Sequence, residues 1–249
     1  MAIIRKFSFL VALILSSIAS LHAQNQPLLV AIPQFVAPFI MSAKDQLYGF
    51  DISMMDEICT IIHRDCKYKI TPFNQLLQSV VDKKTDIAMG SITITAERAK
   101  IVNFSKPYML SETRFIGKKS MKNTPINLDV LKKSKIGIIK GTIFSDELES
   151  MGVDTLKLST FNNQSDIMEA LITGSIDLGL VGNATAHYWQ SQSNEALVAL
   201  GKAIPYGSGI GIAVNIEQTA LLESINQAID TYQNSPNFTR NYNLYLNYF

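Results

Sequence analysis

The feature that most constrains the fold is an alternation of short apolar strands and amphipathic helices that starts twice along the chain. In the first set we expect strands and helices at residues 28–32, 51–62, 67–70, 74–81 and 86–89. A second set follows at residues 135–139, 143–150, 155–158, 165–172, 177–181 and 183–189. This alternation predicts an α/β protein with mostly parallel sheets. The repeated strand–glycine–helix unit favours two lobes over the alternative of one continuous doubly wound sheet.

The N-terminus has the layout of a secretory signal peptide. Arg5 and Lys6 precede an apolar run at 7–18, and small residues lead to an expected cleavage after Ala23. The apolar run is shorter than the about 20 residues that span a bilayer. We therefore predict that residues 1–23 form a signal peptide and that the mature chain is a soluble, exported protein.

The charge of the chain gives no reason to expect nucleic acid or an anionic membrane surface as a partner. The chain has 22 basic and 21 acidic residues. Loss of Arg5 and Lys6 leaves 20 basic and 21 acidic residues, a net charge of −1. Binding to polyanions depends on a basic excess, which is absent here. The apolar share of 47% also excludes a disordered chain.

The two cysteines, Cys59 and Cys66, both lie in the mature chain. In an exported protein such a close pair favours a disulfide. The alternative is a metal site with His63 between them, but a fourth ligand is missing and the compartment oxidises thiols. We therefore favour the disulfide and expect no metal site.

The segment from Gly90 to Arg98 has the chemistry to hold an anion. It follows a strand and brings hydroxyl groups and free backbone amides to the start of a helix, which favours negative charge. Thr95 can cap that helix. Arg98 adds a planar fork of donors that matches a carboxylate in two parallel hydrogen bonds. The alternative is that Thr95 is only a cap and Arg98 forms a surface ion pair.

The segment from Gly90 to Arg98 and a second glycine-containing turn both follow the carboxyl end of an expected strand. Ser91, Thr93 and Arg98 follow a strand of the first set, and the turn 141–143 follows a strand of the second. Ligands of open α/β sheets bind beyond the carboxyl ends of the strands. We therefore expect these residues to face one binding site.

With these motifs the chain resembles the periplasmic amino-acid-binding proteins of ABC importers, the bacterial extracellular solute-binding proteins of family 3. The resemblance covers nearly the whole mature chain, and the spacing of Cys59 and Cys66 matches the disulfide of the basic-amino-acid members. The segments that carry it are 37–39, 49–52, 93–98, 104–108, 137–142 and 174–177.

The resemblance implies a type II-like periplasmic-binding-protein fold, in which two lobes joined by two hinge strands close on a ligand between them. Lobe one would comprise residues 24–112 and 206–249, and lobe two residues 113–205. The partners would be a small carboxylate or amino acid and the permease of an ABC importer in the inner membrane. The protein would be a monomer without a cofactor.

The resemblance also implies roles for single residues in the cleft. Arg98 would hold the α-carboxylate of the ligand, and Phe73 would cover its side chain. Ser91 and Thr93 would add hydroxyl and backbone contacts from lobe one, and the turn at Thr142 and Ile143 would donate amides from lobe two. Core packing remains the alternative for Phe73. The complete set of expected ligand-binding residues is Val36, Phe73, Gly90, Ser91, Thr93, Arg98, Thr142, Ile143 and Gly182.

Position 182 departs from the family pattern. Family members usually carry an aspartate there that pairs with the α-ammonium of the ligand, and this chain has Gly182. A buried ammonium without a carboxylate is costly. Either another acid, such as Asp146 or Glu97, reaches the ligand, or the amine stays partly solvated, or the ligand has no amine.

The expected mouth of the cleft departs from the basic-amino-acid members, which carry an acid and a tyrosine there. Pro33, Phe35, Val36 and Phe39 make this region apolar. Lys140 would add positive charge if it faced the cleft, although a solvated strand end is the more ordinary place for it. This composition favours an uncharged or acidic ligand over arginine or lysine.

Three kinds of function compete. The first is a binding protein without covalent chemistry that feeds an importer, and this is the one we favour. The second is a periplasmic dehydratase-like enzyme on the same scaffold acting on a prephenate-type carboxylate, or an atypical binder of an amine-free acid. The third is a sensory module that presents its ligand to a membrane receptor. An enzyme needs a general acid in the cleft, and no residue stands out as one.

Overall fold

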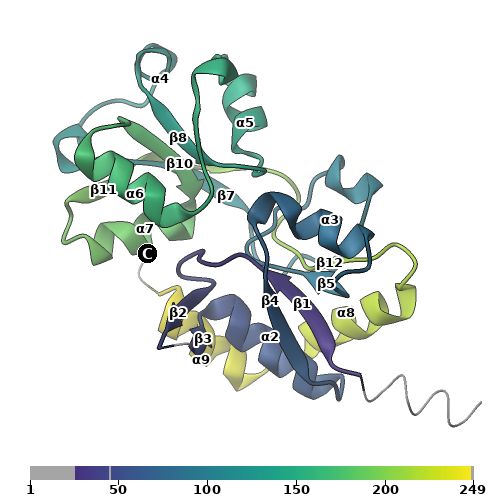
Figure 1. Ribbon diagram of the computed structural model, residues 1–249. Helices are drawn as coiled ribbons and strands as arrows, with labels where there is room; N and C mark the ends of the chain where they lie inside the picture. The colour runs from purple at the N-terminus through teal and green to yellow at the C-terminus, as the bar shows by residue number, and fades with distance from the viewer. Residues whose placement is uncertain (1–25, 45, 248–249) are drawn as a thin grey trace, which may run out of the picture.

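The computed structural model, which describes residues 26–44 and 46–247, has two separate five-stranded sheets (Figure 1). The first sheet has the order β4-β1-β5-β12-β6. Its strands β4, β1 and β5 are parallel, and β12 is antiparallel to its two neighbours. The bounds are β1 Leu28–Ile32, β4 Cys66–Ile70, β5 Ile87–Ala88, β6 Asn103–Phe104 and β12 Ala213–Val214. We call this sheet and its helices lobe one.

The second sheet, with its helices, forms lobe two. Its order is β11-β7-β10-β8-β9. Strands β10, β8 and β9 are parallel, and β7 runs antiparallel to β10 and β11. The bounds are β7 Glu112–Lys118, β8 Ile136–Ile139, β9 Ser159–Phe161, β10 Leu178–Gly182 and β11 Leu197–Pro205. A small hairpin of β2 Met41–Ala43 and β3 Gln46–Tyr48 extends lobe one.

Helices cover both faces of each sheet, and the alternation of side chains along the strands explains how. In β1, Leu28, Val30 and Ile32 pack into a cluster with helices α2 and α8, whereas Ala31 faces a second cluster with α3. In lobe two, neighbouring residues Phe115 and Ile116 of β7 divide in the same way between two clusters. The helices are α2 Phe50–Ile61, α3 Leu76–Val81, α4 Leu128–Lys133, α5 Phe144–Ser150, α6 Gln164–Thr173, α7 Asn183–Gln192, α8 Thr219–Gln233 and α9 Pro236–Tyr245.

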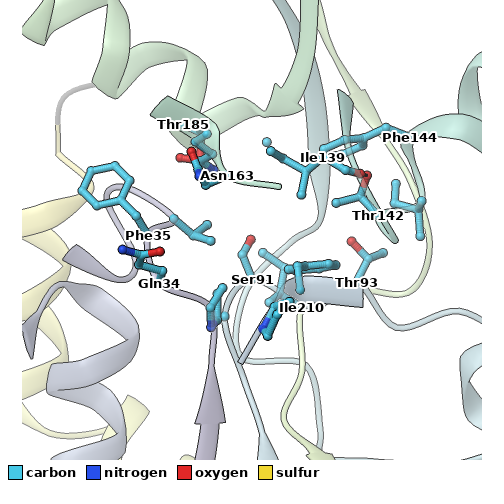
Figure 2. A pocket seen from close by; sticks show the side chains of 18 of the residues that line it. Gln34, Phe35, Ser91, Thr93, Ile139, Thr142, Phe144, Asn163, Thr185 and Ile210 are labelled. Carbon is cyan, nitrogen blue, oxygen red and sulfur yellow. Dashed lines mark hydrogen bonds between the residues drawn. The ribbon is translucent and has the colours of Figure 1, made fainter. Parts of the chain in front are cut away.

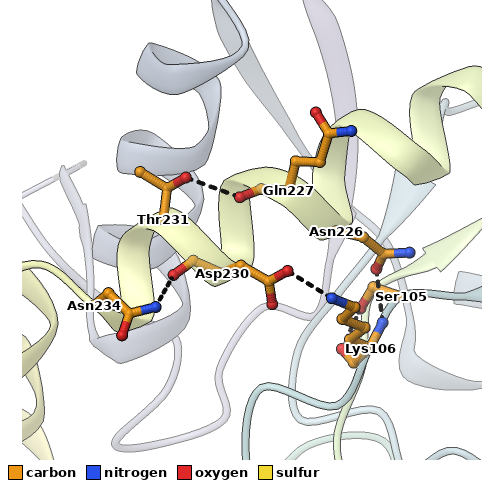
Figure 3. Close-up of polar contacts among 7 residues, drawn as sticks. All are labelled: Ser105, Lys106, Asn226, Gln227, Asp230, Thr231 and Asn234. Atoms are coloured by element: carbon orange, nitrogen blue, oxygen red, sulfur yellow. Dashed lines mark hydrogen bonds and ion pairs between the residues drawn. The ribbon is translucent and has the colours of Figure 1, made fainter.

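The chain returns to lobe one after β11, and α8 anchors this return. The backbone N–H of Lys106 donates to Asn226 Oδ1 (2.7 Å), and its ammonium pairs with Asp230 of α8 (2.5 Å) (Figure 3). On its other face α8 buries Ile225, Ile229 and Tyr232 in the core of lobe one. Sequence segments that lie far apart therefore form a single lobe, as Figure 1 shows in purple and yellow.

Cys59 and Cys66 form a disulfide, so the predicted pairing is confirmed. The bridge joins the last turn of α2 to the first residue of β4. Because β4 is the outermost strand of its sheet, the bridge holds this edge against the helix. The described part of the chain contains no group of three or more His, Cys, Asp or Glu side chains that could hold a metal ion.

Two predicted elements differ from the structure. The expected strand at 155–158 is instead a 3-10 turn at Thr155–Lys157, because the Asp154 side chain accepts a hydrogen bond from the N–H of Leu156 and curls the backbone. Strand β9 begins just after it. The helix expected from Thr95 onward is a short 3-10 turn, Arg98–Lys100, and the Thr95 hydroxyl does accept a hydrogen bond from the N–H of Arg98 (3.2 Å). The predicted signal peptide, residues 1–23, lies outside the described residues.

The disulfide closes a short loop, which sets the size of its effect on stability. The two cysteines are 7 residues apart. Closing a loop of this length lowers the entropy of the unfolded chain, which raises its free energy by about 2 kcal/mol. We expect the double variant Cys59→Ala/Cys66→Ala to lower the free energy of unfolding by about that amount in urea denaturation. Wild-type protein measured with a reductant is the matched control. If reduction left stability unchanged while the variant lost it, the loss would come from side-chain packing.

Candidate functional site

A cavity of about 180 Å³ lies between the two lobes. In Figure 2, Ser91, Thr93 and Gln34 of lobe one face Thr142, Asn163 and Thr185 of lobe two across it. The nine residues predicted to bind the ligand all line this cavity: Val36, Phe73, Gly90, Ser91, Thr93, Arg98, Thr142, Ile143 and Gly182. Their contacts with a ligand remain predictions.

A buried carboxyl group positions the lobe-one wall of the cavity. Gly90 and Ser91 both have positive φ angles, 129° and 55°. A Cβ at Gly90 would lie 2.4 Å from Pro33 Cδ, so only glycine fits. Asp51 of α2 accepts a hydrogen bond from the Ser91 N–H (3.0 Å), and its two carboxyl oxygens share the single donor of the Tyr108 hydroxyl (3.0 Å to each). These bonds hold the loop in its unusual conformation.

Burial raises the pKa of the Asp51 carboxyl from 3.8 to about 7, although hydrogen bonds from Ser91 and Tyr108 lower it. The side chain is fully buried in lobe one. Asp51 does not line the cavity, but its hydrogen bond positions Ser91, which does.

Arg98 touches both lobes at once. Its Nη1 donates to the carbonyl oxygen of Thr93 (2.8 Å) in lobe one, and its Nη2 donates to the carbonyl oxygen of Gly141 (3.1 Å) in lobe two. The guanidinium carbon lies 5.9 Å from the centre of the Phe73 ring, within cation–π range. Burial lowers the pKa of Arg98 to about 10, opposed by the nearby Asp146 and Tyr206. Arg98 is therefore a cation at neutral pH.

Lobe two approaches this side of the cavity closely at Gly141. A Cβ on Gly141 would lie 2.5 Å from the Cβ of Asn74 in lobe one. The turn continues with Thr142, whose hydroxyl and N–H both donate to the carbonyl oxygen of Ile139 (2.6 and 3.3 Å). The N–H of Thr142 thus stabilises the turn, and α5 begins two residues later at Phe144.

A second junction between the lobes closes another side of the cavity. The N–H of Ala37 donates to Gln164 Oε1 (3.2 Å), and the Thr185 hydroxyl donates to the carbonyl oxygen of Ala37 (2.7 Å). Gln164 and Thr185 are both buried and belong to lobe two. Nearby, the rings of Phe35 and Trp189 lie 6.1 Å apart. Bonds at both junctions show that the structure is the closed arrangement of the two lobes.

Gly182 lies at the end of β10, where the backbone turns into α7. Its φ and ψ of −61° and 146° suit any residue, and a Cβ there would meet only Thr185 Oγ1, at 3.7 Å. Beside it, Asn183 Nδ2 donates to Glu112 Oε2 (3.1 Å). Glu112 is the carboxylate among the described residues that line the cavity.

The comparison with known families identifies the fold. The bacterial extracellular solute-binding proteins, family 3, match residues 28–248. The chain belongs to this family. Membership confirms the prediction of a solute-binding protein, and with it the choice of a binding protein over an enzyme.

Relatives of this solute-binding protein cover almost its full length. The arginine-binding periplasmic protein of Mannheimia haemolytica is 28% identical over 90% of this chain and 92% of its own. The solved arginine transport binding protein of Legionella pneumophila is 27% identical with a TM-score of 0.79, over 89% of this chain and 100% of its own. An ancestral arginine-binding protein bound to glutamine is 26% identical with a TM-score of 0.81, over 88% and 97%. They confirm the two-lobe periplasmic-binding-protein fold.

Three residues considered for the cleft of the solute-binding protein do not line it: Asp146, Glu97 and Phe39. The Glu97 carboxylate pairs with Lys100 on the surface (2.5 Å). Phe39 is not at the mouth, because its ring packs against Phe50 in the core of lobe one. Asn183 is the first residue of α7, and its side-chain amide donates to Glu112. Lys140 is exposed and lies outside the cavity lining, as its ordinary interpretation predicts.

Sequence patterns missed several residues of the cleft. Glu112, Gln164 and Thr185 line the cavity but belong to no recognisable motif. Glu112 offered a usable signal, because it is an acid at the boundary expected between the two lobes. Asp51 also gave a signal, since a carboxylate beside Phe50 and Ile52 at the start of an apolar helix needs a buried partner.

We expect Asp51→Asn to reduce the pH dependence of stability. The folded carboxyl keeps its proton up to a pH of about 7, whereas the unfolded one loses it near 3.8. Between these values the unfolded state binds fewer protons, so the free energy of unfolding falls by up to about 1.4 kcal/mol per pH unit as the pH rises. Urea denaturation from pH 4 to 8 measures this slope.

An asparagine can keep hydrogen bonds to both partners of Asp51, the Ser91 N–H and the Tyr108 hydroxyl, so the variant is expected to fold. The control is Asp129→Asn, which changes an exposed carboxylate of α4. It should keep the wild-type slope. Identical slopes for wild type and Asp51→Asn would mean that Asp51 is ionised in the folded protein.

Proposed function

We propose that this chain captures an amino acid between its two lobes and delivers it to the permease of an ABC importer. Membership of the solute-binding family supports the class of function. The observation that carries the choice of ligand is Arg98, a cation that lines the interlobe cavity. The α-carboxylate of the amino acid would lie against its guanidinium group.

The surroundings of Arg98 make it an effective carboxylate clamp. A guanidinium offers five N–H donors, and two of its nitrogens are engaged with the carbonyls of Thr93 and Gly141. Those bonds fix the plane of the group against the Phe73 ring. A charged pair in a closed, water-poor cavity is stronger than the same pair in water.

Closure couples binding to transport in this proposal. The ligand would bind first to Arg98, Ser91, Thr93 and Phe73 of lobe one, and lobe two would then add Thr142 and Ile143. A ligand that contacts both lobes binds the closed form better than the open form, and so shifts the population toward it. The closed form would present surfaces of both lobes to the permease. We also propose that the lobes divide between residues 112 and 113 and between residues 205 and 206.

The proposed location is the periplasm, and the proposed state is a monomer. Relatives carry the word periplasmic in their names. Within residues 26–44 and 46–247, no helix has the length and apolar character needed to cross a membrane. Residues 1–23 would direct export and be removed.

A thermal-shift screen of residues 24–249, refolded to strip ligand, tests the proposed function. The panel holds the twenty common L-amino acids, dicarboxylates, keto acids and prephenate. A ligand that binds only the folded state raises the melting temperature in proportion to the logarithm of its concentration over Kd. Stabilisation by one or a few amino acids is the expected result. Stabilisation by amine-free acids alone would contradict it.

We expect Arg98→Ala to lower the affinity for the amino acid found in the screen by at least about tenfold, because hydrogen bonds to charged groups contribute about 1.5–3 kcal/mol. Isothermal titration calorimetry measures the change. The control is Arg240→Ala, which removes an exposed arginine of α9 outside the cavity. Wild-type affinity in the Arg98 variant would remove the carboxylate clamp from the proposal.

A further inference from the structure

Two charged side chains of opposite sign line the cavity. Among the described residues, Arg98 and Glu112 are the two charged side chains in its wall. The other lining residues are glycines or carry apolar, hydroxyl or amide side chains, such as Phe35, Ser111 and Asn163. An α-amino acid with an uncharged side chain also carries one carboxylate and one ammonium group. The cavity therefore matches that zwitterion charge for charge.

Glu112 lies where the chain passes between the lobes. It is the first residue of β7, and its partner in β11 is Pro205. In the other neighbouring strand, β10, Gly182 is opposite Thr113. Glu112 thus lies one step along the ladder from the partner of Gly182, and it lines the cavity. The side chain is half-buried.

A relay of hydrogen bonds holds the Glu112 carboxylate in place. Arg114 Nη1 donates to Asn183 Oδ1 (3.4 Å), and Asn183 Nδ2 donates to Glu112 Oε2 (3.1 Å). Because arginine can only donate, the amide of Asn183 must present its oxygen to Arg114 and its nitrogen to Glu112. Arg114 is itself fixed by the carbonyl oxygen of Gly201 (2.7 Å).

The relay engages one of the two carboxylate oxygens. Asn183 is the hydrogen-bond partner of Glu112 among the described residues, and it occupies Oε2. The other oxygen, Oε1, can accept from a ligand. Transfer of an ammonium group from water to a cavity is unfavourable unless such an acceptor meets it there.

We infer that Glu112 accepts hydrogen bonds from the α-ammonium group of the ligand, and that Glu112 and Arg98 together select α-amino acids with an uncharged side chain. This inference rests on the proposed binding of an amino acid. A cationic side chain would bring two positive groups to one carboxylate, and an acidic side chain would bring two negative groups to one arginine. In each case one charge would be buried without a partner.

Calorimetry with Glu112→Gln tests this inference. The probes are the twenty common L-amino acids and, for each amino acid that binds, the matching acid without the α-amino group. We expect an uncharged amino acid to bind wild type most tightly. Glu112→Gln should weaken that binding by about tenfold or more, the effect of a charged hydrogen bond. The amine-free acid should bind both proteins within about threefold, because it does not use the carboxylate.

Two further variants separate this role from a structural one. Glu149→Gln changes an exposed acid of α5 in lobe two, outside the cavity, and should bind like wild type. Gly182→Asp added to Glu112→Gln places a carboxylate beside the lost one, at a position with room for a side chain. It should recover a large part of the lost affinity for the amino acid and none for the amine-free acid.

The outcomes distinguish this inference from the proposed function. If no amino acid binds wild type, the proposed function itself fails. If amino acids bind but Glu112→Gln binds them as wild type does, only the role of Glu112 is overturned. Loss of arginine or lysine binding alone in Glu112→Gln would assign the carboxylate to a side-chain cation, and would also overturn the inference.

Discussion

The pairing of β7 with β11 is the constraint on which the rest of the structure depends. Within the described residues the chain passes between the two sheets at 105–111 and at 206–212. The strands that adjoin these crossings are paired, with Glu112 opposite Pro205. The two connections therefore leave lobe two side by side, and the lobes can rotate about this line. Ser111, Glu112 and Thr113 lie on this line and line the cavity, so the axis of closure and the binding site share residues.

Closure around such an axis has to be stabilised at the sides away from it. Two junctions do this: Arg98 with the Gly141 carbonyl, and the Ala37 peptide with Gln164 and Thr185. Each such hydrogen bond contributes about 1 kcal/mol net. A handful of them can hold the lobes together without making opening slow or costly. A ligand that contacts both lobes binds the closed form more tightly than the open form, and this difference in affinity can therefore decide which form predominates. A small energy difference between the two forms also allows the lobes to open and release the ligand.

The sequence predicts the parts of the site that depend on local structure. Arg98, Thr93 and Thr142 could be named because each follows a strand at a turn or helix start, where side chains point to the carboxyl edge of a sheet. Glu112, Gln164 and Thr185 could not, because their roles come from strand register and from lobe contacts over long sequence distances. The strand predicted at 155–158 is wrong for a local reason, because one side-chain hydrogen bond outweighed the extended pattern and formed the turn Thr155–Lys157.

In the proposed function, the position of Arg98 joins recognition to closure. Its Nη2 reaches the Gly141 carbonyl only when lobe two is closed, since Gly141 belongs to lobe two. The same approach packs Gly141 against Asn74 and removes water from one side of the guanidinium. A less hydrated cation attracts a carboxylate more strongly, so closure strengthens the ligand contact just as the ligand favours closure. In the proposed function Glu112 lies at the hinge and Arg98 lies at a junction away from it, so recognition of the ligand and closure of the lobes depend on the same two charges.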